Sequence, residues 1–318
     1  MTRVALVVAV VGATATGKSQ LGLALARRFG AEVVSADASQ LYRGMDIGTA
    51  KLSVAERAGV PHHQLDVLEV TQEASVAAYQ RHARDDVDGI LRRGALPLLV
   101  GGSGLYVRAV LDRLEIPPTD PVVRRRIEER AEREGGAALH AELARRDPVA
   151  AAALAPANTR RVVRALEVLE LTGAPFSATM PRREFLRPTL VLGLRAQRTA
   201  LDARVERRAR AMFDAGLLEE TRALLERGLR AGRTASRALG YAQALAVLDG
   251  SMDREEAVAE TAGRTRRLVR RQESWFGADP RVVWLDALAP DLARVAGAHV
   301  ERALEDADGR GWDDGCHG

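Results

Sequence analysis

The chain of 318 residues contains a single cysteine, Cys316. One thiol excludes an intramolecular disulfide and a thiolate metal site, as is usual for proteins of the reducing cytoplasm. The apolar run Val4–Val11 is too short to cross a membrane and predicts a buried strand instead. We therefore expect a cytoplasmic protein that does not enter a membrane.

Lysine is nearly absent: it occurs only at Lys18 and Lys51, beside 45 arginines. Alanine and arginine are abundant throughout, so the arginine count reflects a compositional bias more than a function. The net charge of +4 is compatible with a nucleic-acid partner and does not prove one. Lys18 lies in a phosphate-binding motif, where a compact ammonium fits and a planar guanidinium would not.

That motif, Gly12–Ser19, reads G-x-x-x-x-G-K-S and lies between the predicted strand and a helical pattern. Its glycines let the backbone wrap an anion, the helix N-terminus points at the anion, and Lys18 adds a positive charge. The Ser19 hydroxyl is placed to hold Mg²⁺. The expected phosphate-binding residues are Gly12, Thr14, Ala15, Thr16, Gly17, Lys18 and Ser19. The motif predicts a bound di- or triphosphate without identifying it.

Apolar runs alternate with helical patterns along most of the chain. This alternation predicts an α/β fold, a P-loop NTPase-like parallel sheet covered by helices on both faces. The expected strands are Val4–Val11, Glu32–Ser35, Leu96–Val100, Leu190–Leu194 and Val282–Leu285. Ligands of such sheets bind at the carboxyl ends of the strands.

The pattern changes between Ile116 and Arg187, where helical stretches follow one another and no strand is evident. We interpret 117–187 as an all-helical insertion domain in an α/β core. The core then consists of 1–116 and of 188–305, whose second part is mostly helical. The tail 306–318 is expected to be disordered.

Two further loops follow predicted strands and carry reactive groups. Asp37 lies just past Glu32–Ser35, where a carboxylate beside a bound phosphate can hold magnesium or act as a general base; the structural alternative is a helix N-cap. Gly101–Tyr106 permits close backbone approach, and its Ser103 offers a hydroxyl to a substrate. Here the alternative is a tight turn with an N-cap serine.

Two clusters are open to two interpretations each. His62 and His63 could suggest a metal site, but adjacent histidines seldom bind one ion, so a packed or hydrogen-bonded pair is favoured. Four arginines on one predicted helix face precede two aromatic residues, which suits RNA phosphates and base stacking, with a solvated surface as the alternative. These residues are Arg266, Arg267, Arg270, Arg271, Trp275 and Phe276.

Taken together, the motifs resemble those of the tRNA dimethylallyltransferases, also called tRNA isopentenyltransferases. Arg43–Lys51 and Val100–Tyr106 are more diagnostic than the phosphate loop, which many kinases share. They also account for Lys51, the second retained lysine. The other matching segments are Gly12–Ser19, Asp37–Gln40, Pro61–His63, Pro118–Pro121, Arg161–Glu167, Gly240–Tyr241 and Thr265–Phe276.

The resemblance implies a reaction. These enzymes transfer the dimethylallyl group of dimethylallyl diphosphate to the exocyclic amine of the adenine next to the anticodon of a tRNA, and they release pyrophosphate. Asp37 matches the family's general base, Arg208 matches an arginine that binds pyrophosphate, and Ser103 keeps the hydroxyl of the usual threonine. Mg²⁺ and Lys18 would neutralise charge on the leaving pyrophosphate. The implied catalytic residues are Asp37, Ser103 and Arg208.

The resemblance also implies a grip on the tRNA anticodon arm by the core and the insertion domain. The implied tRNA-binding residues are Asp37, Ala38, Ser39, Gln40, Ser103, Arg124, Arg160, Arg161, Arg164, Arg237, Gly240 and Tyr241. The chain departs from the family pattern at Ala38, where serine is usual, and at Thr159, where an acidic residue is common. No obligate protein partner is indicated.

Three other functions stay open at this point. A small-molecule or nucleotide kinase would share the phosphate loop and turn over ATP, but it leaves Arg43–Lys51 unexplained. An adenylate isopentenyltransferase would act on a free nucleotide, whereas the insertion and its arginines favour a macromolecule. A non-catalytic RNA-binding scaffold would have no need of an intact Lys18, Ser19 and Asp37.

Overall fold

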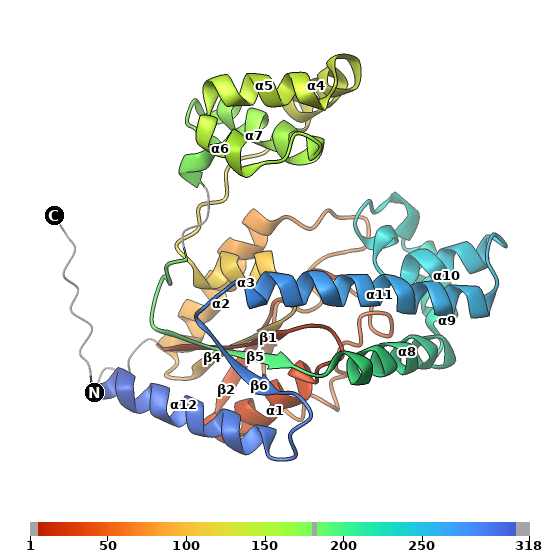
Figure 1. Cartoon of the computed structure of the whole chain (residues 1–318). Helices are drawn as coiled ribbons and strands as arrows, with labels where there is room; N and C mark the ends of the chain where they lie inside the picture. Colours follow the sequence, from red (N-terminus) through yellow and green to blue (C-terminus); the bar gives the residue numbers. More distant parts are fainter. Residues whose placement is uncertain (1–5, 180–182, 310–318) are drawn as a thin grey trace. The chain divides into compact units, whose positions relative to one another are not determined.

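A six-stranded sheet forms the centre of the fold (Figure 1). The structure is a computed structural model that describes residues 6–179 and 183–309. All strand pairs are parallel, in the order β3-β2-β4-β1-β5-β6. The strands are β1 (Val7–Gly12), β2 (Ala31–Ser35), β3 (His62–His63), β4 (Leu96–Gly101), β5 (Thr189–Arg195) and β6 (Val282–Asp286). The predicted α/β fold with a parallel sheet is confirmed.

The sheet is buried on both faces, and this explains its apolar strands. Along β1, Val7 and Val11 belong to one core cluster, while Val8 and Val10 belong to the cluster on the opposite face. Helices α2 (Val76–Arg92) and α3 (Gly104–Leu111) cover the first face, and α1 (Lys18–Phe29) and α12 (Leu292–Gly309) cover the second. Burial on two sides produces a continuous apolar run in place of polar–apolar alternation.

The short strand β3 escaped prediction because it consists of two histidines and carries no apolar signal. Its residues pair with Val33 and Val34 of β2. His62 Nδ1 lies 2.8 Å from the Val60 carbonyl, and His63 Nε2 lies 2.7 Å from a Glu32 carboxylate oxygen. The histidines are therefore hydrogen-bonded, as favoured, and residues 6–179 and 183–309 contain no cluster of metal-binding side chains.

A second helical layer lies beyond the carboxyl end of β5. It consists of α8 (Arg198–Asp214), α9 (Leu217–Glu226), α10 (Tyr241–Leu248) and α11 (Arg254–Gly277), with two 3₁₀ turns at Leu229–Ala231 and Ala235–Arg237. These helices share a core cluster with Tyr42, Met45 and Val70. The segment that follows β2 is thereby fastened to helices far away in the sequence.

The chain divides into two compact units, of which the second is Asp112–Glu184. Within its described residues this unit is helical and contains α4 (Pro121–Glu134), α5 (Gly136–Arg146), α6 (Pro148–Ala153), α7 (Thr159–Thr172) and a 3₁₀ turn at Phe176–Thr179. It has a core of its own, centred on buried Ile127, Leu139 and Leu166. The unit begins five residues before the start, and ends three residues before the end, of the segment 117–187 that was expected from the sequence.

One expectation is wrong in part. Helix α12 continues through residue 309, so residues 306–309 are helical although disorder was expected for 306–318. Ala303 and Leu304 pack against the sheet beyond Ala296 and Val300, and this apolar stripe carries the helix past the predicted end. Residues 310–318 lie outside the described part of the chain. Among the helices that are described, none is long and apolar enough to cross a membrane.

A buried carboxylate organises the helical unit. The Glu167 side chain is fully buried and accepts hydrogen bonds from Arg124 (2.7 Å), Arg164 (2.7 Å) and the backbone amide of Asp120 (2.9 Å). Burial alone raises the pKa of Glu167, but the bonds from Arg124 and Arg164 outweigh it and bring the pKa below the ordinary value of 4.5. Glu167 thus joins α7 to the start of α4.

Replacing this carboxylate should destabilise the helical unit. We expect Glu167→Gln to lower the free energy of unfolding at pH 7 by about 2–3 kcal/mol, because two partly buried guanidiniums lose their counter-ion. Since the folded-state pKa is depressed, the wild-type advantage exists above pH 4.5 and is lost as the pH falls through the folded pKa. Urea unfolding at several pH values measures this. Glu170→Gln, which breaks the exposed pair with Arg126, is the control and should change little.

Candidate active site

Three loops meet at the carboxyl edge of the sheet because β2, β4 and β1 are neighbours. The Ser103 amide donates to the Ala36 carbonyl at 3.2 Å, and the Ala38 amide donates to the Ser103 hydroxyl at 3.3 Å. A Cβ on Gly101 would lie 2.2 Å from the Ala36 carbonyl oxygen, so only glycine permits this approach. The loops after β2 and β4 are thus locked together.

The phosphate loop follows β1 and opens α1. Gly12 has a φ of 140°, and a Cβ there would lie 2.5 Å from the Leu194 carbonyl oxygen on β5. Thr16 Oγ1 donates to the Ala13 carbonyl at 2.7 Å, and Lys18 Nζ donates to the same oxygen at 2.6 Å. The loop therefore has the fixed curvature that an anion-binding backbone needs.

Two cations and one carboxylate interact across the site. The pKa of Lys18 is lowered to about 8, chiefly by burial; the charge of Asp37 opposes this shift, and that of Arg208 adds to it. Burial also lowers the pKa of Arg208, and Asp37 opposes this shift. Asp37 is thus the electrostatic partner of both cations, and an anionic ligand would be a second one.

Asp37 does not cap a helix. Its Oδ1 accepts a hydrogen bond of 2.9 Å from the Ser39 amide, and the residues that follow form a turn. One cavity is lined by Asp37 with Lys18, Ser19 and Arg208. The structural alternative considered for Asp37 is therefore wrong, and its carboxylate borders a cavity beside the phosphate loop.

A second cavity adjoins the first. Asp37, Arg208, Thr14 and Thr49 line both cavities, and Ser103 lines the second only. Further residues of the second cavity are Ser39, Gly48, Met212, Leu239, Thr261, Thr265, Leu268 and Gln272. Asp37 and Arg208 therefore lie where the two cavities adjoin.

Sequence reasoning missed Gln272 as a site residue, although it lies in a matching segment. From α11, its Oε1 accepts from the Thr14 amide at 2.9 Å and its Nε2 donates to the Gly102 carbonyl at 2.9 Å. It thereby joins the phosphate loop to the loop after β4. A glutamine among arginines gives no signal of such a role.

Magnesium is the metal that suits this donor set. Ser19 offers a hydroxyl and Asp37 a carboxylate to the same cavity, and Mg²⁺ prefers such oxygen ligands. In proteins it takes few side-chain ligands and fills its sphere with substrate phosphates and water. A diphosphate site with one hydroxyl and one carboxylate fits that habit.

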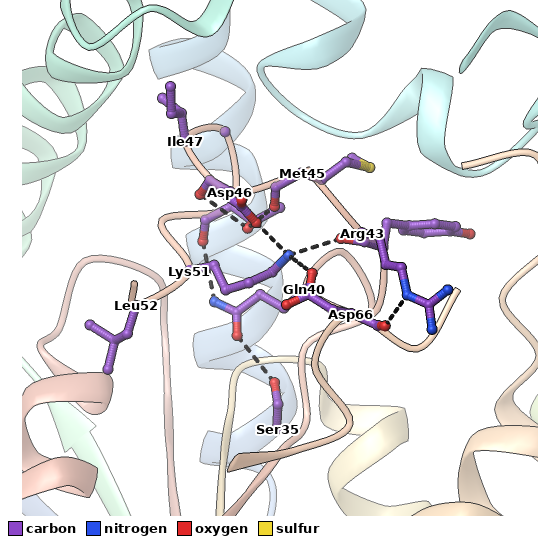
Figure 2. A network of polar contacts seen from close by, with 12 residues as sticks. Ser35, Gln40, Arg43, Met45, Asp46, Ile47, Lys51, Leu52 and Asp66 are labelled. Carbon is purple, nitrogen blue, oxygen red and sulfur yellow. Dashed lines mark hydrogen bonds and ion pairs between the residues drawn. The ribbon is translucent and has the colours of Figure 1, made fainter. Parts of the chain in front are cut away.

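The segment that follows the turn at Asp37 lines the first cavity with Thr49, Ala50 and Leu52, and a polar network holds it in place (Figure 2). Gln40 Oε1 accepts from the Ser35 hydroxyl at 3.1 Å, and its Nε2 donates to the Thr49 carbonyl at 3.3 Å. Arg208 Nη2 donates to the same carbonyl at 3.2 Å. Lys51 is buried behind this segment, with its ammonium surrounded by oxygen atoms.

The residues expected to contact tRNA differ in exposure. Arg160, Arg161 and Arg237 are exposed. Tyr241 is fully buried, and its hydroxyl donates to Glu220 at 2.5 Å, so direct contact of this side chain with RNA is ruled out. Gly240 is buried beside it. These two residues shape the protein interior.

The predicted arginine-rich face lies on α11, but only part of it is exposed to solvent. Arg267, Arg270 and Arg271 are exposed, whereas Phe276 is buried in the core. Trp275 is 39% exposed, and its ring fills the space that a side chain at position 104 would need. Stacking of a base on Phe276 is therefore excluded.

A family model described as IPP transferase matches residues 40–279. The chain is 58% identical over 290 residues to the tRNA dimethylallyltransferase of Nocardia farcinica, a match that covers 91% of this chain and 93% of that protein. The chain belongs to the tRNA dimethylallyltransferase family. It is a prenyltransferase, and the resemblance found in the sequence is confirmed.

Other members of the family agree. The Mycobacterium tuberculosis tRNA dimethylallyltransferase is 57% identical over 298 residues, covering 90% of this chain and 95% of that protein. The tRNA isopentenylpyrophosphate transferase of Bacillus halodurans has a similar structure, with a TM-score of 0.70, 38% identity, and coverage of 96% and 98% of the two chains. A eukaryotic dimethylallyltransferase described as acting on tRNA has a TM-score of 0.78 and 25% identity, with coverage of 98% and 81%.

The lowered pKa of Lys18 predicts a pH dependence of diphosphate binding. Because the pKa of Lys18 is about 8, the advantage of wild type over Lys18→Met in affinity for pyrophosphate without metal should fall about tenfold between pH 7 and pH 9. Pyrophosphate also loses its last proton over this range, and the comparison with Lys18→Met cancels that effect. Calorimetric titration of both proteins measures the ratio of affinities; an equal ratio at pH 7 and pH 9 would show that Lys18 stays charged.

Proposed function

We propose that this enzyme transfers the dimethylallyl group of dimethylallyl diphosphate to the exocyclic amine of the adenine adjacent to the anticodon of a tRNA. Pyrophosphate is the second product. The observation that carries the proposal is the position of Asp37, which borders both the cavity beside the phosphate loop and the cavity beside Ser103. A base at this point serves a donor and an acceptor that enter from different cavities.

The proposed reaction is a displacement at the allylic carbon. The bond between that carbon and the diphosphate oxygen breaks with its electron pair on oxygen, while the adenine amine forms a bond to the carbon. Asp37 takes the proton of the amine, whose lone pair is otherwise delocalised into the ring. Lys18 and Arg208 hold the pyrophosphate as its charge grows. Ser19 would hold Mg²⁺, which supplies further charge neutralisation when bound.

The acceptor adenine has to leave the stack of the anticodon loop to reach Asp37. The second cavity combines the polar groups of Asp37, Ser39 and Ser103 with apolar side chains, as a pocket for a planar base requires. Gln40 belongs instead to the first cavity, where Ser35 and Thr49 already engage it. We place the base beside Ser103.

The tRNA backbone is held by arginines of both units in this proposal. Arg160 and Arg161 are exposed and free to contact phosphates, and Arg237 is exposed on the core. Arg124 and Arg164 are paired with buried Glu167, so they support the helical unit as well as any RNA contact. A tRNA substrate also agrees with a cytoplasmic location.

The direct test is incubation with unmodified tRNA, Mg²⁺ and dimethylallyl diphosphate, followed by mass analysis of the nucleosides. We expect one adenine per susceptible tRNA to gain a five-carbon group. A parallel reaction with AMP in place of tRNA tests the free-nucleotide alternative. Steady ATP hydrolysis without prenyl transfer to RNA would refute the proposal and favour a kinase.

Asp37→Asn tests the base. The amide keeps the shape and the hydrogen bond from the Ser39 amide but accepts no proton. Single-turnover transfer at saturating substrates should fall by about a hundredfold or more, with pyrophosphate and tRNA affinities changed little. Near-normal transfer by this variant would reduce Asp37 to a positioning or metal-binding role.

Reversal of the exposed arginines tests the RNA grip. Arg160→Glu with Arg161→Glu should weaken tRNA binding by about tenfold or more and flatten its salt dependence, because fewer counterions are released. Pyrophosphate binding should be unaffected. The matched control reverses Arg133 and Arg145, which are exposed on other helices of the same unit. Equal losses in both double variants would reveal a general charge effect and no specific contact.

A further inference from the structure

Lys51 occupies an unusual position for a lysine. Its side chain is only 2% exposed, yet the carboxylates it pairs with, on Asp46 and Asp66, are 56% and 37% exposed. Its Nζ donates to the Tyr42 carbonyl at 2.9 Å, to Asp46 at 2.7 Å and to Asp66 at 2.6 Å (Figure 2). An ammonium has three donors, and each has a partner here.

This arrangement explains why lysine persists in a chain with 45 arginines. A guanidinium has five donors in a plane, whereas the pocket offers three acceptors around one point. An arginine at position 51 would leave buried donors unpaired. The site therefore selects for the geometry of the ammonium as well as for its charge.

The bond from Lys51 to the Tyr42 carbonyl closes residues 42–51 into a ring, the bond to Asp46 spans its inside, and the bond to Asp66 ties it to a later segment. The Lys51 amide also donates to the Asp46 carbonyl at 3.0 Å, and the Thr49 hydroxyl donates to the Met45 carbonyl at 2.6 Å. On the other side of the ring, Glu220 accepts from the Ile47 amide at 2.9 Å. The backbone between positions 46 and 51 is thus held from two directions.

The ring fixes the position of the Thr49 carbonyl at the candidate active site. The Thr49 oxygen accepts hydrogen bonds from Arg208 at 3.2 Å and from Gln40 at 3.3 Å, and Thr49 lines both cavities. A guanidinium tethered at one nitrogen keeps its other donors pointed in a fixed direction. We propose that Lys51 is a positioning residue, which orients Arg208 toward the diphosphate through the Thr49 carbonyl.

This inference rests on the proposed role of Arg208 in diphosphate binding, and inorganic pyrophosphate tests it without prenyl transfer. Lys51→Met should weaken pyrophosphate binding by about tenfold in the wild-type background and by less than about twofold in an Arg208→Gln background. Lys51→Arg should behave like Lys51→Met despite its charge. Calorimetry on the full chain gives the affinities, and thermal unfolding shows that each variant is folded.

Arg57→Met is the matched control. Arg57 lies 3.8 Å from the same Asp66 carboxylate, and its Nε donates to the Leu52 carbonyl at 3.0 Å, one residue past the ring. It makes no bond to residues 42–51, so its removal should leave pyrophosphate affinity within about twofold of wild type. If Lys51→Met does not fold, Asp66→Asn replaces it in the cycle, because Asp66 is partly exposed and asparagine tolerates its φ of 56°.

Two results would overturn the inference. One is unchanged pyrophosphate affinity in the Lys51 variant; the other is an equal loss in both backgrounds, which would show a structural effect independent of Arg208. Absence of prenyl transfer together with a preserved coupling between Lys51 and Arg208 would refute the proposed function alone. The two failures are therefore distinguishable.

Discussion

The charge balance among Asp37, Lys18 and Arg208 is the constraint around which the site is built. Two buried cations repel each other and lose hydration, and Asp37 opposes the pKa shift of each. In the proposed reaction, the diphosphate takes over as their partner when it binds, and the carboxylate becomes available to the acceptor amine. Ligand binding and readiness of the base are then linked through electrostatics.

That balance depends on distances set by the sheet and by the helices beyond it. Glycines at positions 12 and 101 let the loops approach neighbouring carbonyls closely. Arg208 arrives from α8, and Gln272 from α11 joins two of the loops. A cluster of buried side chains fastens these helices to the segment after β2. The groups proposed for catalysis thus come from a sheet edge and from a helical layer that is fastened to the segment after β2.

The sequence was a good guide wherever one local signal sufficed. Five strands are apolar runs because both faces of the sheet are buried, and the phosphate loop has a strict spacing. No signal in the sequence marked β3 or the role of Gln272. A two-residue strand forms only because β2 lies beside it, and the role of a single amide is set by its partners in the folded chain. For the same reason Tyr241, assigned to RNA from a motif, proved to be interior, and its exposure could not be read from the motif. Likewise, the sequence did not show that Arg124 and Arg164 pair with Glu167, because that contact depends on how α4 and α7 pack.

The two points at which the core chain leaves for the helical unit and returns from it are hydrogen-bonded to each other. The Leu186 amide donates to the Leu111 carbonyl at 2.7 Å, so the core chain leaves and returns at one point. For a segment inserted between adjacent ends, the entropic cost of loop closure to its host grows only slowly with the length of the segment. The helical unit can therefore change in size and surface while the catalytic core keeps its stability. In evolutionary terms, the unit proposed to contact RNA is free to diversify without disturbing the core that holds the candidate active site.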